Sequence, residues 1–368
     1  MPEARARETY HLLQPRPNPK TLSLVIPMYN EEAVVPFLRA EVEKFMSEVP
    51  TDMEVVLVND GSSDRTIDKV TEWAAEDQRI KVIHLSRNFG HQLALTAGLD
   101  YATGDSIAII DADLQDPLGV IHQMIEGYRK GYDVVYGQRQ AREGESVGFK
   151  VSAWIFYRLM RLLIYKSLPL DTGDFRLVSR QCLDGLKSMR ETHRFLRGMV
   201  AWVGFPQTTV PYERAARAAG QTKYPLRKML QFAWTAAVSY SPAPLRLTMA
   251  AGMLLGALGF ADGVYAVGRH VLGYRNVPGW TSVIAVNCLV GGGILVGIGV
   301  LGEYVGRIFE EVKGRPLYVV SVRRDGAAAG PPDRANAHPA RPTARATVYR
   351  ALSVTAPADV DARAGRAD

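Results

Sequence analysis

The sequence predicts an α/β domain with a doubly wound, mostly parallel sheet, followed by an interfacial amphipathic helix and two transmembrane helices. Between residues 20 and 140, short apolar runs alternate with segments whose apolar residues recur at helical intervals. Such alternation is typical of a mostly parallel sheet with helices on both faces. Beyond residue 246 come two apolar stretches that are long enough to cross a bilayer, which needs about 20 residues per helix.

The expected strands are the apolar runs of the first part of the chain. They are Leu22–Pro27, Glu54–Asp60, Ile80–Ser86, Ser106–Asp111 and Asp133–Arg139. Helical spacing follows the first strand in Phe37, Leu38, Val42, Phe45 and Met46, and it follows the second in Ile67, Val70 and Trp73. We expect both sets to face the core.

Open parallel sheets bind ligands beyond the carboxyl ends of their strands. The residues that follow the apolar runs are therefore the ones expected to carry chemistry. The polar segments in these positions are Pro27–Glu31, Asn59–Asp64, Ser86–Gly90 and Asp111–Pro117.

The most informative of these segments is the acidic run that begins at Asp111. A strand running through it would point Asp111 and Asp113 to the same side of the sheet. Paired carboxylates at a strand end suit Mg²⁺ or Mn²⁺ bound to a diphosphate. The alternative is an acidic turn before Pro117, because Asp and Pro are common turn formers.

Asp60 ends the second strand, and Gly61 opens a tight turn in which Ser62 or Ser63 can cap the next helix. A carboxylate at this position could also accept hydrogen bonds from a base or a ribose. Neither GxGxxG nor GxxxxGK[ST] follows the first strand, which argues against a dinucleotide-dependent dehydrogenase and a P-loop protein. The pattern favours a metal-bridged sugar nucleotide.

Several short motifs occur in a specific order and spacing between about residue 20 and residue 322. They are Val25–Glu31, Val58–Asp64, Arg87–Gly90, Asp111–Pro117, Gly173–Leu177, Arg194–Gly198 and Gly302–Gly306. In this order the chain resembles the inverting family 2 glycosyltransferases of GT-A fold. Within them it is similar to the polyprenyl-phosphate glycosyltransferases akin to dolichyl-phosphate mannose synthase and the bactoprenol glucosyltransferases.

The resemblance implies roles for individual residues. Contacts to the nucleotide sugar are implied for Pro27, Tyr29, Glu31, Asp60 and Asp111. The metal, Mg²⁺ or Mn²⁺, is expected on Asp111, Asp113 and Gln115. Asp113, Asp174 and Arg139 are the expected catalytic residues, with Asp174 in the position often assigned as base.

A cationic lining is expected as well, because two anionic substrates must approach each other in such a reaction. Its candidates are Arg139, Arg142, Lys150, Arg194, Arg197, Arg214, Arg217 and Lys223. The resemblance implies acceptor-phosphate contacts for Arg139 and Lys150. We add Arg194 and Arg197 to the acceptor phosphate, and Lys223 to the nucleotide sugar. The alternative for each is an ordinary solvated surface charge.

The role of Asp174 depends on the acceptor. A phosphate monoester has a second pKa near 6 and is largely dianionic at neutral pH. Its attacking oxygen scarcely needs a base, so we expect Asp174 to orient basic residues or the sugar. Catalysis would then rest on in-line positioning and on stabilising the departing nucleoside diphosphate.

The expected membrane spans are Leu247–Gly268 and Thr281–Leu301. Before them, Leu226, Met229, Leu230, Ala233, Trp234 and Ala237 share a helical face. This face predicts an amphipathic helix over residues 224–246 in the cytoplasmic interface, with a soluble core helix as the alternative. Positive charges after the second span outnumber those between the spans. The catalytic domain and both termini are therefore predicted cytoplasmic, at the inner (plasma) membrane.

Composition fits a membrane-associated chain. The net charge of +6 and the pI near 9.2 suit an anionic membrane face. Nucleic acid is the alternative partner, but no base-reading module accompanies the charge. Two separated cysteines, Cys182 and Cys288, do not indicate a disulfide framework. Homo-oligomerisation stays open.

The expected domain organisation has five parts. They are an N-terminal tail (1–20), a catalytic domain (21–223), the juxtamembrane helix (224–246), a two-helix membrane region with its end segment (247–322) and a C-terminal tail (323–368). Both tails are expected to be disordered, since neither shows sustained apolar periodicity. The first also lacks the apolar core of a signal peptide.

The sequence thus predicts metal-dependent, inverting transfer of one sugar from a nucleotide donor to a polyprenyl phosphate, giving a lipid-linked sugar for cell-envelope glycosylation. UDP-glucose with undecaprenyl or decaprenyl phosphate is the preferred pair, and GDP-mannose or an amino-sugar UDP derivative is the alternative donor. A processive polysaccharide synthase is disfavoured because Gln-x-x-Arg-Trp is absent where Arg194–Trp202 stands. A catalytically inactive membrane scaffold is disfavoured by the intact set of Asp60, Asp111, Asp113 and Gln115.

Overall fold

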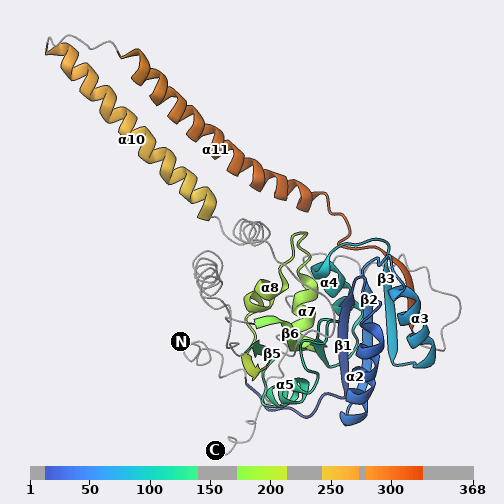
Figure 1. Ribbon diagram of the computed structural model, residues 1–368. Coiled ribbons are helices and arrows are strands. Elements are labelled where there is room, and N and C mark those ends of the chain that lie inside the picture. Colours follow the sequence, from blue (N-terminus) through green and yellow to red (C-terminus); the bar gives the residue numbers. More distant parts are fainter. Residues whose placement is uncertain (1–12, 140–171, 214–242, 273–278, 326–368) are drawn as a thin grey trace, which may run out of the picture.

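A mixed, mostly parallel sheet forms the centre of the α/β part of the molecule (Figure 1). The computed structural model describes residues 13–139, 172–213, 243–272 and 279–325. Within them the sheet has eight strands in the order β7-β5-β6-β4-β1-β2-β3-β8. The strands are β1 (Thr21–Met28), β2 (Asp52–Asn59), β3 (Ile80–Leu85), β4 (Ser106–Ile109), β5 (Val134–Arg139), β6 (Thr172–Ser179), β7 (Gln207–Tyr212) and β8 (Val320–Asp325).

Within the described residues, neighbouring strands are parallel except where β6 or β8 takes part. β1 to β4 run parallel to one another, and β5 runs parallel to β7. β6 is antiparallel to its neighbours β4 and β5, and β8 is antiparallel to β3. The predicted mostly parallel α/β class is therefore confirmed.

Helices cover both faces of the sheet, as a doubly wound fold requires. On one face lie α2 (Val35–Glu48), α3 (Thr66–Glu76) and α5 (Val120–Arg129). On the other lie α4 (His91–Tyr101), α7 (Arg180–Ser188) and α8 (Leu196–Val203). Strand residues alternate between the two cores: Val55 and Leu57 face the first, whereas Val56 and Val58 face the second.

The predicted core stripe of α2 is buried at Leu38, Val42, Phe45 and Met46. Phe37 was expected in this stripe but is 60% exposed, because it lies about 100° around the helix from Leu38. In α3, Val70 and Trp73 are buried as predicted, whereas Ile67 in the first turn is 38% exposed.

The position of α4 depends on a glycine. A Cβ atom at Gly98 would lie 2.4 Å from Val25 Cγ1 and 3.0 Å from Val58 Cγ2. The backbone of α4 therefore lies directly on β1 and β2, which only a residue without a side chain permits. This close contact places the first turn of α4 at the carboxyl end of the sheet, beside the acidic run.

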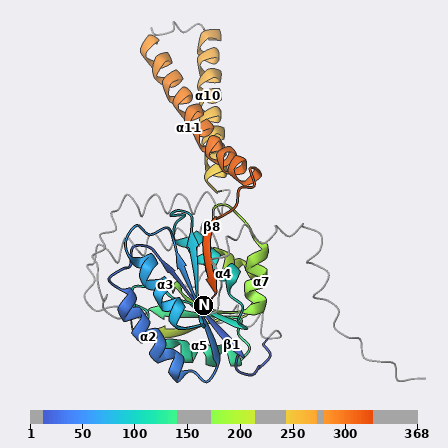
Figure 2. The ribbon, with the colours of Figure 1, turned by 90° about the vertical axis from the view of Figure 1, so that its right-hand side faces the viewer.

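Two long helices form an antiparallel hairpin that extends away from the sheet (Figures 1 and 2). They are α10 (Ala243–Val271) and α11 (Trp280–Val312), and they contain both predicted spans. By length and composition, Pro244–Arg269 and Leu289–Val312 could each cross a membrane. Their apolar side chains are largely exposed, as a lipid-facing hairpin would require. Most of the predicted juxtamembrane helix, residues 224–242, lies outside the described residues.

The chain returns to the sheet after α11. It turns at Gly314, which has a φ of +61°, then buries Leu317 and Tyr318 and pairs with β3 as β8. The sequence analysis did not predict this strand. The expected boundary between membrane region and tail, at residue 323, falls inside β8, so residues 323–325 are strand rather than tail.

A buried carboxylate ties the strands together at the end opposite the acidic run. Glu54, 6% exposed, accepts hydrogen bonds from Ser23 on β1, Lys81 on β3 and Thr103 before β4. Burial would raise the pKa of Glu54, but these donors outweigh it and lower the pKa to about 2. The carboxylate therefore holds three neighbouring segments while charged.

We expect Glu54→Ala to lower the thermal midpoint of the detergent-solubilised protein by about 6–12 °C, since removing one partner of a buried ion pair costs about 3 kcal/mol. Glu43→Ala is the control, because Glu43 pairs with Arg39 at the surface, and its midpoint should stay within about 2 °C. Because the pKa of Glu54 is depressed, its contribution should be complete above about pH 4.5 and disappear as the pH falls toward 2. An unchanged acid-side slope in Glu54→Gln would contradict this assignment.

Candidate functional site

The loops that follow β1 and β2 are bound to each other at the carboxyl end of the sheet. The backbone N–H of Asn30 donates to Ser62 Oγ at 3.0 Å, and that of Glu31 donates to Thr66 Oγ1 at 2.9 Å. Tyr29, which precedes Asn30, is 47% exposed. Tyr29 and Glu31 therefore lie on a rim beyond the end of β1, where the sequence analysis placed nucleotide contacts, whereas Pro27 is buried within β1 and pairs with Val58.

Asp60 is buried and joins this rim to the next loop. Its Oδ1 accepts the N–H of Phe89 at 2.7 Å, and its Oδ2 accepts that of Gly90 at 2.9 Å. The loops approach so closely that a Cβ at Gly61 would lie 2.4 Å from the carbonyl carbon of Arg87. Asp60 thus fixes the residues that begin α4, and its contact with a nucleotide stays a prediction.

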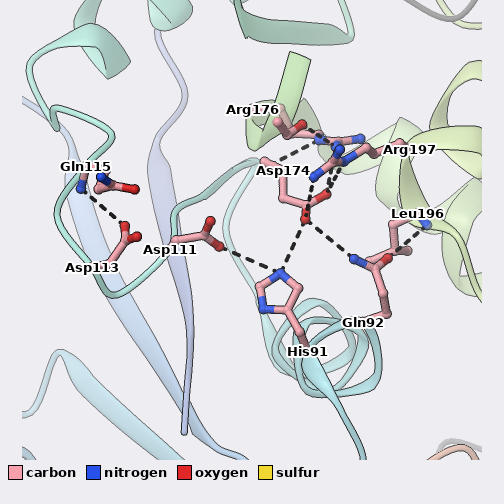
Figure 3. A network of polar contacts seen from close by, with 10 residues as sticks. His91, Gln92, Asp111, Asp113, Gln115, Asp174, Arg176, Leu196 and Arg197 are labelled. Carbon is pink, nitrogen blue, oxygen red and sulfur yellow. Dashed lines mark hydrogen bonds and ion pairs between the residues drawn. The ribbon is translucent and has the colours of Figure 1, made fainter. Parts of the chain in front are cut away.

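The acidic run lies in a turn, not in a strand. β4 ends at Ile109, and Leu114 has a φ of +56°. The expectation that strand alternation aligns Asp111 with Asp113 is wrong, because the strand stops before either residue. Instead, Asp113 Oδ1 accepts the N–H of Gln115 at 3.2 Å, and the Asp111 carboxylate faces His91 (Figure 3). The turn therefore coexists with a site that presents two carboxylates.

The Asp111 carboxylate fits a cation. Its Oδ1 is shielded from solvent and accepts no hydrogen bond. Burial is the largest cause of a raised pKa at Asp111, so an added positive charge would stabilise the ionised form. Across the described residues, no three His, Cys, Asp or Glu side chains converge closely enough to hold a metal ion. A divalent ion here would take its remaining ligands from water and phosphate oxygens, as Mg²⁺ commonly does.

Asp174, on β6, is the centre of a buried set of polar contacts (Figure 3). Arg197 Nε donates to its Oδ1 at 3.0 Å, and Arg176 Nη2 donates to the same oxygen at 3.2 Å. His91 Nε2 lies 3.3 Å from Oδ2, and Gln92 Nε2 lies 3.5 Å from it. Three elements, α4, β6 and α8, therefore meet at one carboxylate.

Asp174 stays ionised at any ordinary pH. Burial would raise its pKa, but the hydrogen bond with His91 and the charges of Arg197 and Arg176 outweigh burial and hold the pKa well below its usual range. So acidic a carboxyl is a poor proton acceptor near pH 7. Asp174 is suited to hold arginines in place rather than to act as a base.

Arg139 ends β5 beside this centre. Its Nε donates to Tyr212 Oη at 3.3 Å, and Tyr212 Oη donates in turn to Asp116 Oδ1 at 2.5 Å. A Cβ at Gly173 would lie 2.7 Å from Arg139 Nη2, so the guanidinium lies against the strand that carries Asp174. Arg139 thus lies against the strand whose Asp174 pairs with Arg197, and the roles assigned to the three residues stay predictions.

The remaining predicted cations have different outcomes. Arg194 lies in the loop before α8, where its Nη1 donates to the carbonyl of Met189 at 2.5 Å. This bond closes the loop, which is a structural role that the sequence analysis did not foresee. The other candidates lie outside the described residues: Arg142, Lys150, Arg214, Arg217 and Lys223.

The sequence analysis did not identify His91 and Gln92 as site residues. They directly follow the Arg87–Gly90 motif and form the first turn of α4, which lies beside the acidic run and β6. His91 Nε2 lies 3.7 Å from Asp111 Oδ1 as well as 3.3 Å from Asp174, so it stands between the two carboxylates. The sequence did contain a sign of their role, because these two polar residues begin a helix directly after a motif at the end of a strand.

Known proteins of similar sequence cover most of the chain. Residues 23–186 match the family described as Glycosyl transferase family 2. The Uncharacterized glycosyltransferase YkcC of Bacillus subtilis is 45% identical over 81% of this chain and 92% of its own length. The Uncharacterized glycosyltransferase sll0501 of Synechocystis sp. is 40% identical over 82% and 94%. The SfII prophage-derived bactoprenol glucosyl transferase of Shigella flexneri is 36% identical over 83% and 99%.

Each of these alignments spans more than four-fifths of the chain and more than nine-tenths of the relative. The chain therefore belongs to glycosyltransferase family 2.

Proposed function

We propose that this glycosyltransferase transfers a single sugar, with inversion, from a nucleotide sugar to a polyprenyl phosphate at a membrane surface. The observation that carries the proposal is the Asp174 carboxylate, which holds Arg197 beside Arg139 a short distance from the acidic turn. Carboxylates suited to a metal-bound diphosphate thus face cations suited to a second phosphate. UDP-glucose with undecaprenyl or decaprenyl phosphate is the preferred pair, with GDP-mannose or an amino-sugar UDP derivative as the alternative donor.

Relatives support the acceptor class. Several bactoprenol glucosyl transferases are 36% identical to this chain over at least 81% of its length. The hairpin of α10 and α11 supports the same class, because a membrane-anchored enzyme meets a lipid acceptor in the plane where that acceptor lies. The start of α10 and the end of α11 lie at the same end of the hairpin, toward the sheet (Figure 1). If both helices span the membrane, the segments before and after the hairpin lie on one side of it, and we propose that this side is the cytoplasm.

On the donor side, Asp111, Asp113 and Gln115 would hold Mg²⁺ or Mn²⁺. The ion would neutralise the charge that develops on the departing nucleoside diphosphate. The rim of Tyr29 and Glu31 would receive the nucleotide, with Pro27 near the end of β1 as a further proposed contact, and Asp60 would hold that rim against α4. Lys223 is proposed to approach the same diphosphate.

On the acceptor side, Arg139 and Arg197 would bind the lipid phosphate, with Lys150 and Arg194 as further proposed contacts. Arg197 would contribute its positive charge to the lipid phosphate while its Nε and Nη2 are paired with Asp174. The phosphate arrives as a dianion and attacks the anomeric carbon without losing a proton. Asp174 orients the arginines, and no general base is required.

The direct test is a transfer assay on purified full-length protein with radiolabelled UDP-glucose, GDP-mannose and UDP-N-acetylglucosamine, and with undecaprenyl phosphate as acceptor. We expect a glycosyl-phosphoryl-lipid from UDP-glucose. Product from another donor alone would replace the sugar assignment, and no lipid product from any donor would reject the proposed function.

In the same assay Asp113→Asn should lower kcat by about three orders of magnitude, because the metal would lose a charged ligand. Asp68→Asn is the matched control, since Asp68 lies exposed on α3. Near-normal turnover of Asp113→Asn at saturating Mg²⁺ or Mn²⁺ would reject the metal assignment.

Asp174→Asn should lower kcat by about tenfold, short of the 10²–10⁴ that loss of a general base commonly costs. Because the pKa of Asp174 lies far below neutrality, titration of Asp174 should cause no change in the wild-type kcat between about pH 6 and pH 9. The measurement is kcat against pH for both proteins. Recovery of the variant at raised pH would identify Asp174 as a true base.

Arg139→Ala should raise the KM for lipid phosphate about tenfold or more by removing a charge-assisted contact, with little change in the donor KM. Arg129→Ala serves as control, because Arg129 is half exposed on α5 and pairs with Glu126. Separate titrations of donor and acceptor distinguish the outcomes. A change confined to the donor KM would mean that the acceptor site has been misplaced.

A further inference from the structure

We propose that Glu311, at the sheet-facing end of α11, is a positioning residue that sets the place of Arg197 through the loop between α7 and α8. The proposal rests on the proposed function, because it concerns the acceptor side of the same site. It joins two parts of the molecule, the end of a membrane-type helix and a cation of the catalytic centre.

The first contact is direct. Glu311 Oε2 accepts the backbone N–H of Thr192 at 2.8 Å, across 119 positions of sequence. On the adjacent residue, Glu310 Oε2 lies 2.7 Å from His193 Nε2. Two consecutive carboxylates of α11 thus meet two consecutive residues of the α7–α8 loop.

A second contact holds the start of that loop to the segment that follows α11. Tyr318, which is 1% exposed, donates from Oη to Asp100 Oδ2 at 2.8 Å. Arg190 Nη1 donates to both oxygens of Asp100, at 2.9 and 2.8 Å. The loop is therefore fastened to the C-terminal part of the described chain at Arg190 and again at Thr192.

The loop leads directly into the site. Arg194 bonds back to Met189 and closes it, and the N–H of Leu196 donates to Gln92 Oε1 at 3.1 Å. The next residue is Arg197, whose Nε and Nη2 donate to Asp174. A shift of the loop at Thr192 is thus passed to Arg197 within five residues.

The contact of Glu311 is better suited to placement than to stability. Glu311 is exposed, and a hydrogen bond of an exposed carboxylate contributes little to the free energy of unfolding. The core below the loop is held by buried Leu196, Met199 and Val200, whatever the state of Glu311. Loss of the carboxylate should therefore leave the domain folded and loosen the loop at Thr192, while Glu310 still faces His193.

The kinetic test uses the full-length protein with the best donor. Glu311→Ala should raise the KM for lipid phosphate about three- to tenfold and leave the donor KM unchanged. Glu311→Gln should restore the wild-type acceptor KM, because its amide oxygen can still accept the Thr192 N–H. Lys313→Ala is the control at the same end of α11, where Lys313 Nζ lies 4.1 Å from the ring centroid of Phe309, and it should match the wild type.

A double-mutant cycle identifies the route. If Glu311 acts through Arg197, Glu311→Ala should have no further effect on the acceptor KM in an Arg197→Ala background. Additive effects of the two changes would overturn the proposal, as would an unchanged acceptor KM in Glu311→Ala alone.

Hydrogen exchange gives a readout that needs no turnover. Amides of residues 192–197 should exchange several-fold faster in Glu311→Ala than in the wild type and Glu311→Gln, while the β1 and β2 amides stay equally protected. Unchanged exchange at 192–197 would refute the contact itself. If these amides exchange faster in Glu311→Ala but neither the wild type nor any variant glycosylates the lipid, the proposed function is rejected, and the structural connection from Glu311 to Arg197 is retained.

Discussion

The buried carboxylate of Asp174 is the interaction on which the arrangement of the site depends. It lies on the antiparallel strand β6, and it receives side chains from α4, from α8 and from its own strand. Leaving such a charge without its partners costs about 3–5 kcal/mol, so the elements that supply those partners are held to one geometry. The ion pair with Arg197 is thereby placed beside Arg139, and His91 is placed beside Asp111.

Charge is divided across this centre. Carboxylates of the acidic turn lie on one side, guanidinium groups lie on the other, and His91 stands between Asp111 and Asp174. In the proposed reaction both substrates are anionic, so each needs positive charge, and the two sides would supply it differently. A divalent ion on the carboxylates would serve the donor, whereas fixed arginines would serve the acceptor. The chain also leaves the sheet for the α10–α11 hairpin and returns to its edge as β8, which brings the end of α11 against the loop that carries the acceptor side.

Much of the fold could be predicted because the relevant signals are local. Continuous apolar runs such as that of β2, which is buried from its second residue to its last, and helical spacing in α2 and α3 are properties of adjacent residues, and the predicted strands match β1 to β5 within two residues at each end. β8 could not be predicted in this way. It is a short edge strand with two arginines and an aspartate among its six residues, and its pairing partner β3 lies some 240 positions earlier in the chain, so nothing local marks it.

By itself the sequence determined which residue types stand at the carboxyl ends of the strands, since three of the predicted strands end at Asp60, Asp111 and Arg139. Only the tertiary structure decided what those side chains do. In the folded chain the acidic run lies in a turn after β4, and both carboxylate oxygens of Asp60 accept hydrogen bonds from the two residues directly before α4. Arg197 pairs with Asp174, whereas Arg194 bonds to Met189 within its own loop. The physical reason is that a charged side chain takes its role from its partners. Those of Asp174 come from positions 91, 92, 176 and 197, which only the folded chain brings together.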